Sequence, residues 1–102
     1  MAAPVAFNLT VVGLSIHNAD LDTLERHDVS VERRNFIVRG LVKSSGVAGA
    51  FLLSTCNRKE LYLQHDATVD VKKVLSQAKF FQPGCSPFIN TGLPAYRRFS
   101  VK

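Results

Sequence analysis

The segment LLSTCNRKELY, residues 52–62, places a cysteine two residues before an arginine, between two apolar runs. A cysteine attacks as its thiolate, so it needs exposure, fixed geometry and positive charge nearby. A turn at a strand end provides the first two, and Arg58 provides the charge. The guanidinium of Arg58 can also bind a carboxylate through two parallel hydrogen bonds, which a lysine cannot copy. One turn can therefore hold a nucleophile, Cys56, and an anchor for an acidic substrate.

Two neighbouring side chains fit this interpretation, and a simpler one competes with it. Thr55 and Asn57 are short polar residues that can orient a bound carbonyl group. A free cysteine is, however, more often a buried thiol that does no chemistry, and Arg58 can be a solvated turn residue. The local residues alone leave both interpretations open.

The composition limits the classes of protein that this chain can represent. Its 102 residues, 46% hydrophobic and 21% charged, predict a single folded domain over 1–102. Two cysteines make no disulfide framework, no secretory signal is evident, and no apolar run reaches the roughly 18 residues of a membrane span. We therefore expect a cytoplasmic protein without a membrane partner. A formal net charge of +5 favours an anionic partner such as nucleic acid, although many small basic domains bind none.

Hydrophobic periodicity predicts the elements that position the TCNR segment. Strands are expected at 7–15, 49–55, 59–65 and 88–90, and helices at 31–45 and 69–79. Residues 16–30 are expected to form a functional loop with a helical turn near Leu24, and Pro94 to begin another helix. Helix caps are expected at Ser30, Gly46 and Thr68.

The order β-α-β-β-α-β predicts an α+β fold of the ferredoxin-like kind. In this split β-α-β sandwich, helices cover one face of an antiparallel sheet, and TCNR connects two strands as a hairpin turn. The helix at 31–45 carries a basic set that favours either an RNA-binding surface or a solvated helix face: Arg33, Arg34, Arg39 and Lys43.

Two motifs of this chain resemble the N-terminal catalytic domain of glutamyl-tRNA reductase. The family's opening motif reads close to GLSVHTAPVEMRE, and its central motif reads STCNRxEIY. The matches to the first are Gly13, Leu14, Ser15, His17, Ala19 and Glu25. The matches to the second are Ser54, Thr55, Cys56, Asn57, Arg58, Glu60 and Tyr62. The resemblance covers nearly the whole chain, because the expected elements agree with the motif spacing.

The resemblance implies an NADPH-dependent oxidoreductase of tetrapyrrole (porphyrin) biosynthesis, in the cytoplasm or in a plastid stroma. Cys56 would attack the ester of glutamyl-tRNA and form a thioester, which hydride reduces to glutamate 1-semialdehyde. Arg58 would recognise the glutamate, and Thr55 and Asn57 would line the same pocket. His17, which lies in the first motif, would touch the substrate, shape the pocket, or have only a structural role.

The chain departs from the family pattern at several positions. Asp20 replaces a usual proline, Leu24 a usual arginine, and Arg97 aligns with a histidine important for activity. Arginine cannot donate or accept a proton near neutral pH. With Arg97 at this position, either activity would be altered or another group would act on the ribose oxygen that leaves. No GxGxxG follows a strand, so we expect no cofactor-binding residues here and expect the NADPH-binding and homodimerisation domains of the family to be absent from these residues. This fragment alone is not expected to reduce glutamyl-tRNA, and a non-catalytic RNA-binding or regulatory module is the alternative function.

The remaining cysteine and histidines carry no motif. Cys85 lies in a loop rich in proline and glycine and is expected to be a spare thiol. His27 and His65 have no assigned role. These residues lack the spacing of metal ligands, so no metal is expected.

Overall fold

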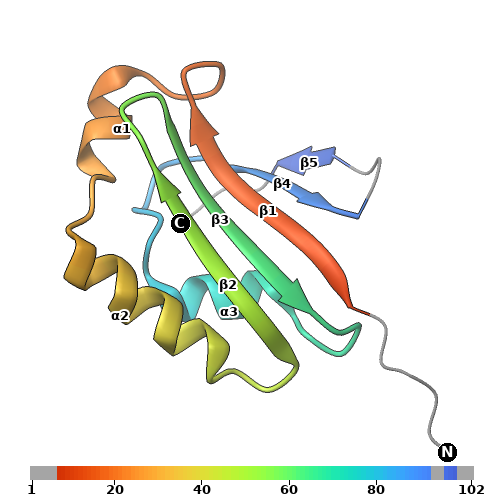
Figure 1. Cartoon of the computed structure of the whole chain (residues 1–102). Helices are drawn as coiled ribbons and strands as arrows, with labels where there is room; N and C mark the ends of the chain where they lie inside the picture. Colours follow the sequence, from red (N-terminus) through yellow and green to blue (C-terminus); the bar gives the residue numbers. More distant parts are fainter. Residues whose placement is uncertain (1–6, 93–95, 99–102) are drawn as a thin grey trace, which may run out of the picture.

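The computed structural model describes residues 7–92 and, for the backbone alone, residues 96–98. Eight elements follow one another in these described residues (Figure 1). They are β1 (Asn8–Ser15), α1 (Leu21–Arg26), α2 (Val31–Val42), β2 (Val47–Ser54), β3 (Arg58–His65), α3 (Val71–Ala78), β4 (Phe88–Thr91) and β5 (Tyr96–Arg98). The predicted order β-α-β-β-α-β is present, with α1 and β5 in addition.

The described strands form one antiparallel sheet in the order β2-β3-β1-β4-β5. Figure 1 shows α3 behind this sheet and α2 running along β2, where the two elements are in contact. A sheet of antiparallel strands combined with separate helices makes the predicted α+β class correct.

Alternation along the strands gives the sheet two different faces. One face packs on the helices and is called the core face. Its residues form a single buried cluster with side chains of all three described helices; the members from the strands and helices are Val12, Leu14, Val47, Leu52, Leu61, Leu63, Leu24, Ile37, Leu41 and Leu75. The other side, called the open face, carries Leu9, Val11, Gly13, Phe51, Glu60 and Tyr62. Leu9 and Phe51 are exposed there because no described helix covers them.

Polar side chains start the three helices. Asp20, Ser30 and Asp70 accept hydrogen bonds from the backbone N–H groups of Thr23, Arg33 and Lys73, respectively. The prediction for Ser30 is confirmed. The prediction for Thr68 is wrong, because Asp70 caps α3 while Thr68 donates to Asp66.

Two predicted helix boundaries differ from the structure. Helix α2 ends at Val42 with Lys43 as its cap, and Gly46 lies in the following turn at φ 86°. The helix expected from Pro94 is wrong over Tyr96–Arg98, which is a strand; Pro94 itself lies outside the described residues. Pairing with β4 overrides the local signal there, since Arg97 stands opposite Ile89 in the sheet. Of the described helices, none is long and apolar enough to span a membrane.

Candidate active site

The TCNR segment forms the tight connection between β2 and β3, as its position between two strands predicts. The N–H of Thr55 donates to the carbonyl of Arg58 at 2.8 Å. The hydroxyl of Thr55 accepts from the N–H groups of Asn57, at 3.3 Å, and Arg58, at 3.1 Å. Thr55 therefore closes the turn from both ends. Cys56 lies inside this closed turn and is an exposed free thiol.

The loop after β1 is tied to the same turn. Ile16 N–H donates to the carbonyl of Asn57 at 3.2 Å, so the two loops lie side by side at one end of the sheet. Within the first loop, the Asn18 side chain accepts from Ser15 N–H at 2.7 Å and fixes the backbone. His17 belongs to this loop and is exposed. The structure thus brings His17 to the same end of the sheet as Cys56.

Arg58 lies on the open face and is held by a neighbour on its own strand. Its Nη2 donates to Oε1 of Glu60 at 2.5 Å, and Tyr62 OH donates to the same oxygen at 3.0 Å. The hydrogen bond to Glu60 raises the pKa of Arg58, so the guanidinium stays cationic. Burial, followed by the hydrogen bond to Glu60, raises the pKa of Tyr62, which therefore stays a phenol that can donate.

A second cation lies on the opposite side of the same strand. Lys59 has the same strand parity as Leu61 and Leu63, so it points to the core face, and it is 1% exposed. Its ammonium donates to Asp28, in the connection between α1 and α2, and to Ser54 Oγ at 3.0 Å. These two bonds compensate the buried charge and attach the helical layer to the strands that flank the turn.

The predicted site residues fall into two groups. Thr55, Cys56, Asn57 and Arg58 share the β2–β3 turn, with His17 in the adjoining loop. Arg97 lies in β5, which is separated from β3 by β1 and β4 in the sheet order. Its side chain lies outside the described part of the structure.

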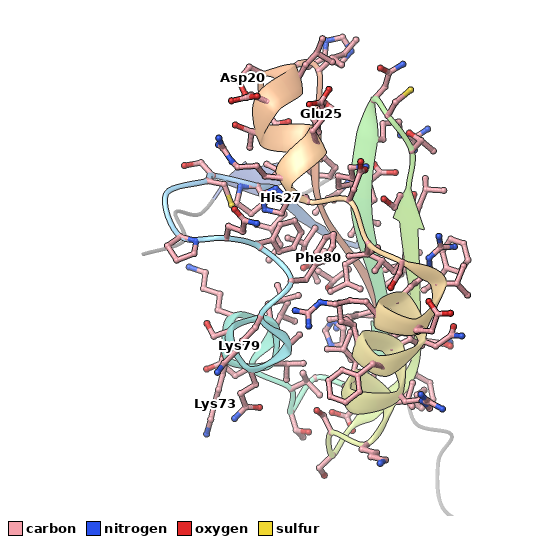
Figure 2. All side chains as sticks on the ribbon, turned by 90° about the vertical axis from the view of Figure 1, so that its left-hand side faces the viewer. Asp20, Glu25, His27, Lys73, Lys79 and Phe80 are labelled. Atoms are coloured by element: carbon pink, nitrogen blue, oxygen red, sulfur yellow. The ribbon has the colours of Figure 1, made fainter. Side chains whose placement is uncertain are left out.

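Sequence reasoning missed a histidine that organises a different part of the molecule. His27 is 3% exposed, accepts from Gln82 N–H at 3.0 Å through Nε2, and lies 2.8 Å from the Thr23 carbonyl through Nδ1. Figure 2 shows His27 beside Phe80 below α1, with their ring centroids 5.9 Å apart. No sequence pattern marks this role, because Gln82 and Phe80 are more than fifty residues away from His27 along the chain.

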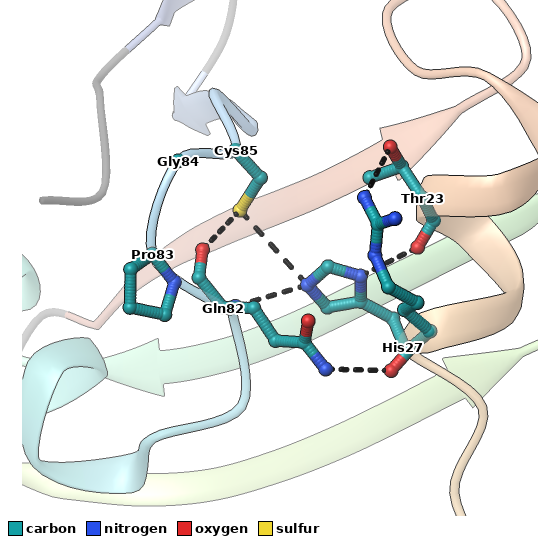
Figure 3. A pocket seen from close by; sticks show the side chains of 7 residues that line it. Thr23, His27, Gln82, Pro83, Gly84 and Cys85 are labelled. Atoms are coloured by element: carbon teal, nitrogen blue, oxygen red, sulfur yellow. Dashed lines mark hydrogen bonds between the residues drawn. The ribbon is translucent and has the colours of Figure 1, made fainter.

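His27 also lines a cavity of about 280 Å³ between α1 and the loop before β4 (Figure 3). Cys85 lines it too; its thiol donates to the carbonyl of Gln82 at 2.9 Å and lies 3.9 Å from His27 Nε2. Burial raises the pKa of the Cys85 thiol, which disfavours the reactive thiolate. The cavity therefore lacks an activated nucleophile. In the described part of the chain, no group of three or more His, Cys, Asp or Glu side chains is arranged to hold a metal ion.

Comparison with known proteins gives a consistent family. Residues 12–88 match the family model described as "Glutamyl-tRNAGlu reductase, N-terminal domain". The chain is 42% identical over 71 residues to a glutamyl-tRNA reductase of Kineococcus radiotolerans, an alignment that covers 66% of this chain and 16% of that protein. It is 37% identical over 67 residues to a glutamyl-tRNA reductase of Wigglesworthia glossinidia brevipalpis, with the same two coverages. Glutamyl-tRNA reductase 2 of Hordeum vulgare is 36% identical over 56 residues, or 55% of this chain and 12% of that protein. The chain thus spans about a sixth or less of the length of these curated relatives.

Proposed function

Because this chain belongs to the family of glutamyl-tRNA reductase N-terminal domains, we propose that it accepts the glutamyl group of glutamyl-tRNA on Cys56. The observation that carries this proposal is the β2–β3 turn, which holds an exposed thiol two residues from a fixed arginine. Arg58 would bind the side-chain carboxylate of the glutamyl group, and Thr55 and Asn57 would line its pocket. In the longer family members, the product would be glutamate 1-semialdehyde for tetrapyrrole biosynthesis.

The proposed step at Cys56 is an acyl transfer. The Cys56 thiol gives its proton to solvent water, and the thiolate sulfur attacks the carbonyl carbon of the ester that joins glutamate to the terminal ribose of the tRNA. A carbon–sulfur bond forms, the carbon–oxygen bond to the ribose breaks, and the tRNA leaves with both electrons of that bond. The exposure and rigidity of the turn support this role, because a nucleophile must reach the carbonyl in a fixed geometry.

The ribose oxygen needs a proton as it leaves, and we propose that His17 supplies it. Of the three histidines, His27 and His65 are buried in hydrogen bonds, whereas His17 is exposed beside the catalytic turn. An imidazole can give and take a proton near neutral pH, which the guanidinium of Arg97 cannot. This assignment would explain how the chain tolerates arginine where the family has histidine.

NADPH is the proposed reductant, but the described residues do not fit it. A dinucleotide needs clustered glycines between a strand and a helix, so that the backbone can approach the pyrophosphate. Here the β1–α1 connection contains no glycine, and the space beside Gly13 within β1 is filled by Glu60 Cγ and Phe88 Cζ, 2.8 and 2.9 Å from an added Cβ. We propose that NADPH is bound by polypeptide other than these residues, and that this chain alone does not catalyse the reduction. Homodimerisation likewise stays a proposal for the longer family members.

The fold is proposed to be ferredoxin-like. The strand order β2-β3-β1-β4 with antiparallel pairing supports it, as does the buried cluster that joins all three helices to one sheet face. Strand β5 extends the sheet by one position beyond this arrangement.

A second candidate function is a basic RNA-binding module. Two cationic residues of α2, Arg33 and Arg39, and its C-terminal cap Lys43 are exposed, and so is Phe36 of the same helix. Arg34 differs from the other three, because it is only half-exposed and its Nε is buried without a hydrogen-bond partner among the described residues. For this function, tRNA affinity should fall steeply with salt and with joint replacement of Arg33 and Arg39 by alanine.

Transfer of labelled glutamate from glutamyl-tRNA to the chain tests the catalytic proposal. The wild-type chain should retain label after the tRNA is removed, and Cys56→Ser should retain none. Cys85→Ser is the matched control, because it removes the other thiol and should leave transfer unchanged. Absence of label in the folded wild-type chain, or equal label in Cys56→Ser, would contradict the proposal.

A further inference from the structure

Glu60 is a buried carboxylate on the otherwise open face of the sheet. It stands directly opposite Gly13 in the pairing of β1 with β3, and it is 7% exposed. A Cβ at position 13 would lie 2.8 Å from Glu60 Cγ and 2.9 Å from the Lys59 carbonyl oxygen. Because Gly13 has no side chain, the Glu60 side chain can lie in the space above it, which we call the seat of Glu60. A carboxylate in such a seat needs donors to compensate its lost hydration.

Two donors on the same strand and the same face satisfy this need. Arg58 Nη2 and Tyr62 OH, two residues before and after Glu60, both donate to its Oε1. Because side chains alternate along a strand, this spacing places all three groups in one row. The seat over Gly13 thus fixes the position of Glu60 Oε1, the oxygen to which Arg58 donates.

The bond to Glu60 uses one nitrogen of the Arg58 guanidinium. The Arg58 side chain also lies beside Tyr62, but it is half exposed and has five N–H donors, so N–H groups beyond the one that bonds Glu60 remain available. A guanidinium has five donors in a fixed planar arrangement, and two of them can bind a second carboxylate in parallel. Without Glu60, the long Arg58 side chain, whose exposed fraction is 52%, would sample many rotamers.

We propose that Glu60, seated over Gly13, is a positioning residue that orients Arg58 toward the carboxylate of the glutamyl group. This inference rests on the proposed function of Arg58 and Cys56. Glu60 itself does not contact the substrate, since its carboxylate would repel the one being bound. Its role is to make Arg58 selective, so that a glutamyl group is preferred over a neutral group of the same shape.

A comparison of two aminoacyl groups on one tRNA tests this role. The same tRNA is charged with glutamate or with glutamine, and the rates of transfer to Cys56 are compared for the wild-type chain and for Glu60→Gln. The variant should lose about tenfold of the preference for glutamate, a size typical of coupling between residues in contact. The glutamine rate should be unchanged, because glutamine lacks the carboxylate that Arg58 binds. A purely structural role of Glu60 would lower both rates equally and leave the preference intact.

Two further variants make the outcome specific to Glu60. Glu32→Gln changes the net charge by the same amount at an exposed position of α2 and should keep the full preference. Glu60→Met keeps the volume above Gly13 but removes both acceptor oxygens, so it should lose the preference as Glu60→Gln does. Circular dichroism and the alkylation rate of Cys56 show whether each variant keeps its fold and its thiol.

Failure of the inference differs from failure of the proposed function. If wild-type chain transfers glutamate with a strong preference that both Glu60 variants retain, the positioning role is wrong and the proposed function stands. If the wild-type chain transfers nothing, the proposed function fails, and the rate of Arg58 modification by phenylglyoxal tests the positioning by itself. Faster modification in Glu60→Gln than in wild type supports an arginine held by Glu60, and equal rates contradict it.

Discussion

The two thiols of this chain lie in opposite surroundings. Cys56 is exposed within a closed turn, whereas Cys85 is 9% exposed and donates its S–H proton to a backbone carbonyl. Burial raises the pKa of Cys85, so at any given pH a smaller fraction of it is thiolate than for an exposed cysteine. Nucleophilic reactivity is therefore expected at Cys56.

Alkylation measures this difference directly. Near neutral pH, iodoacetamide should modify Cys56 at least about tenfold faster than Cys85 in the folded chain, because Cys56 is exposed, whereas burial hinders access to Cys85 and raises its pKa. Peptide mapping by mass spectrometry gives the two rates separately. In urea the rates should converge, and similar rates in the folded chain would contradict the structure.

Replacement of Arg58 by lysine tests the proposed binding of the glutamyl carboxylate by the Arg58 guanidinium. Lysine keeps the positive charge but cannot offer two parallel donors or reach Glu60 with a planar group. Transfer of glutamate to Cys56 should fall by about tenfold or more, while alkylation of Cys56 stays within about twofold of wild type. An unchanged transfer rate would show that charge alone suffices.

At the scale of single residues, sequence and structure agree best where the motif is contiguous. The prediction that TCNR forms a hairpin turn is correct because four neighbouring residues suffice to specify it. The seat of Glu60 depends on Gly13 standing opposite it, and strand register cannot be derived from either segment alone. The burial of Lys59 could have been inferred from the sequence, because Lys59 lies on the same face of the strand as Leu61 and Leu63. The general preference of lysine for solvent argued against that inference.

At the scale of elements, two glycines near α2 have opposite roles. Gly46 adopts φ 86°, and a Cβ there would lie 2.6 Å from Val69 Cγ2. Gly40 lies within α2, and an added Cβ would meet nothing within 4 Å. The turn before β2 therefore requires glycine, and the helix does not.

Substitution by alanine should separate the two positions. Gly46→Ala should lower the free energy of unfolding by about 2 kcal/mol, because it combines backbone strain with the contact to Val69. Gly40→Ala should raise it by about 1 kcal/mol, the difference in helix propensity. Urea unfolding followed by circular dichroism measures both, and a stabilising Gly46→Ala would contradict the described turn.

The ion pair between Lys59 and Asp28 connects β3 to the segment between α1 and α2, and it is asymmetric. The Lys59 side chain is 1% exposed, but that of Asp28 is 67% exposed. Removal of the aspartate leaves a buried ammonium, whereas removal of the lysine leaves a carboxylate that water can solvate.

The two substitutions should therefore differ in cost. Asp28→Ala should lower the free energy of unfolding by about 3 kcal/mol, whereas Lys59→Met, which keeps an apolar stem in place, should change it by less than about 1 kcal/mol. Urea unfolding of the two variants at the same pH gives the comparison. Equal costs would mean that Lys59 is better solvated than the structure indicates.

The periodic elements were predictable, and their ends were less so. Strands β1 to β4 and helices α2 and α3 appear where apolar spacing places them, because core burial imposes that spacing. Asp70 rather than Thr68 starts α3; both residue types are good N-caps, so the sequence alone does not decide between them. Residues 96–98 pair with β4, a contact along the sheet that a local proline signal cannot predict.

At the scale of the whole molecule, the two faces of the sheet are unequal. The core face is buried by the helices, while the open face has a shallow groove lined by Leu9, Gly49, Ala50, Phe51, Tyr62 and Gln64. Leu9 and Phe51 are more than half exposed there. An apolar surface of this kind is unusual for a face that meets only water.

A hydrophobic fluorescent dye should bind this open face. Phe51→Lys should lower the dye fluorescence of the folded chain by about twofold, because it places a charge in the groove. Phe36→Lys is the matched control, since Phe36 is 68% exposed on α2 and does not line the groove. A larger effect of Phe36→Lys would contradict the assignment of the main apolar surface to the open face.

The α+β class and the family could be predicted for the whole chain, because both depend on patterns that extend over most of its length. The proposed reduction depends on more than these residues, since the chain spans 16% of the length of relatives such as the Kineococcus radiotolerans protein. The step that we propose for the described residues by themselves is the acyl transfer to Cys56.

The most direct test of this account is the mass of the wild-type chain after incubation with glutamyl-tRNA. The account predicts one added glutamyl group, located by peptide mapping on Cys56 and released by hydroxylamine, as a thioester is. An unmodified Cys56 that still reacts with iodoacetamide, in the presence of intact glutamyl-tRNA, would contradict it.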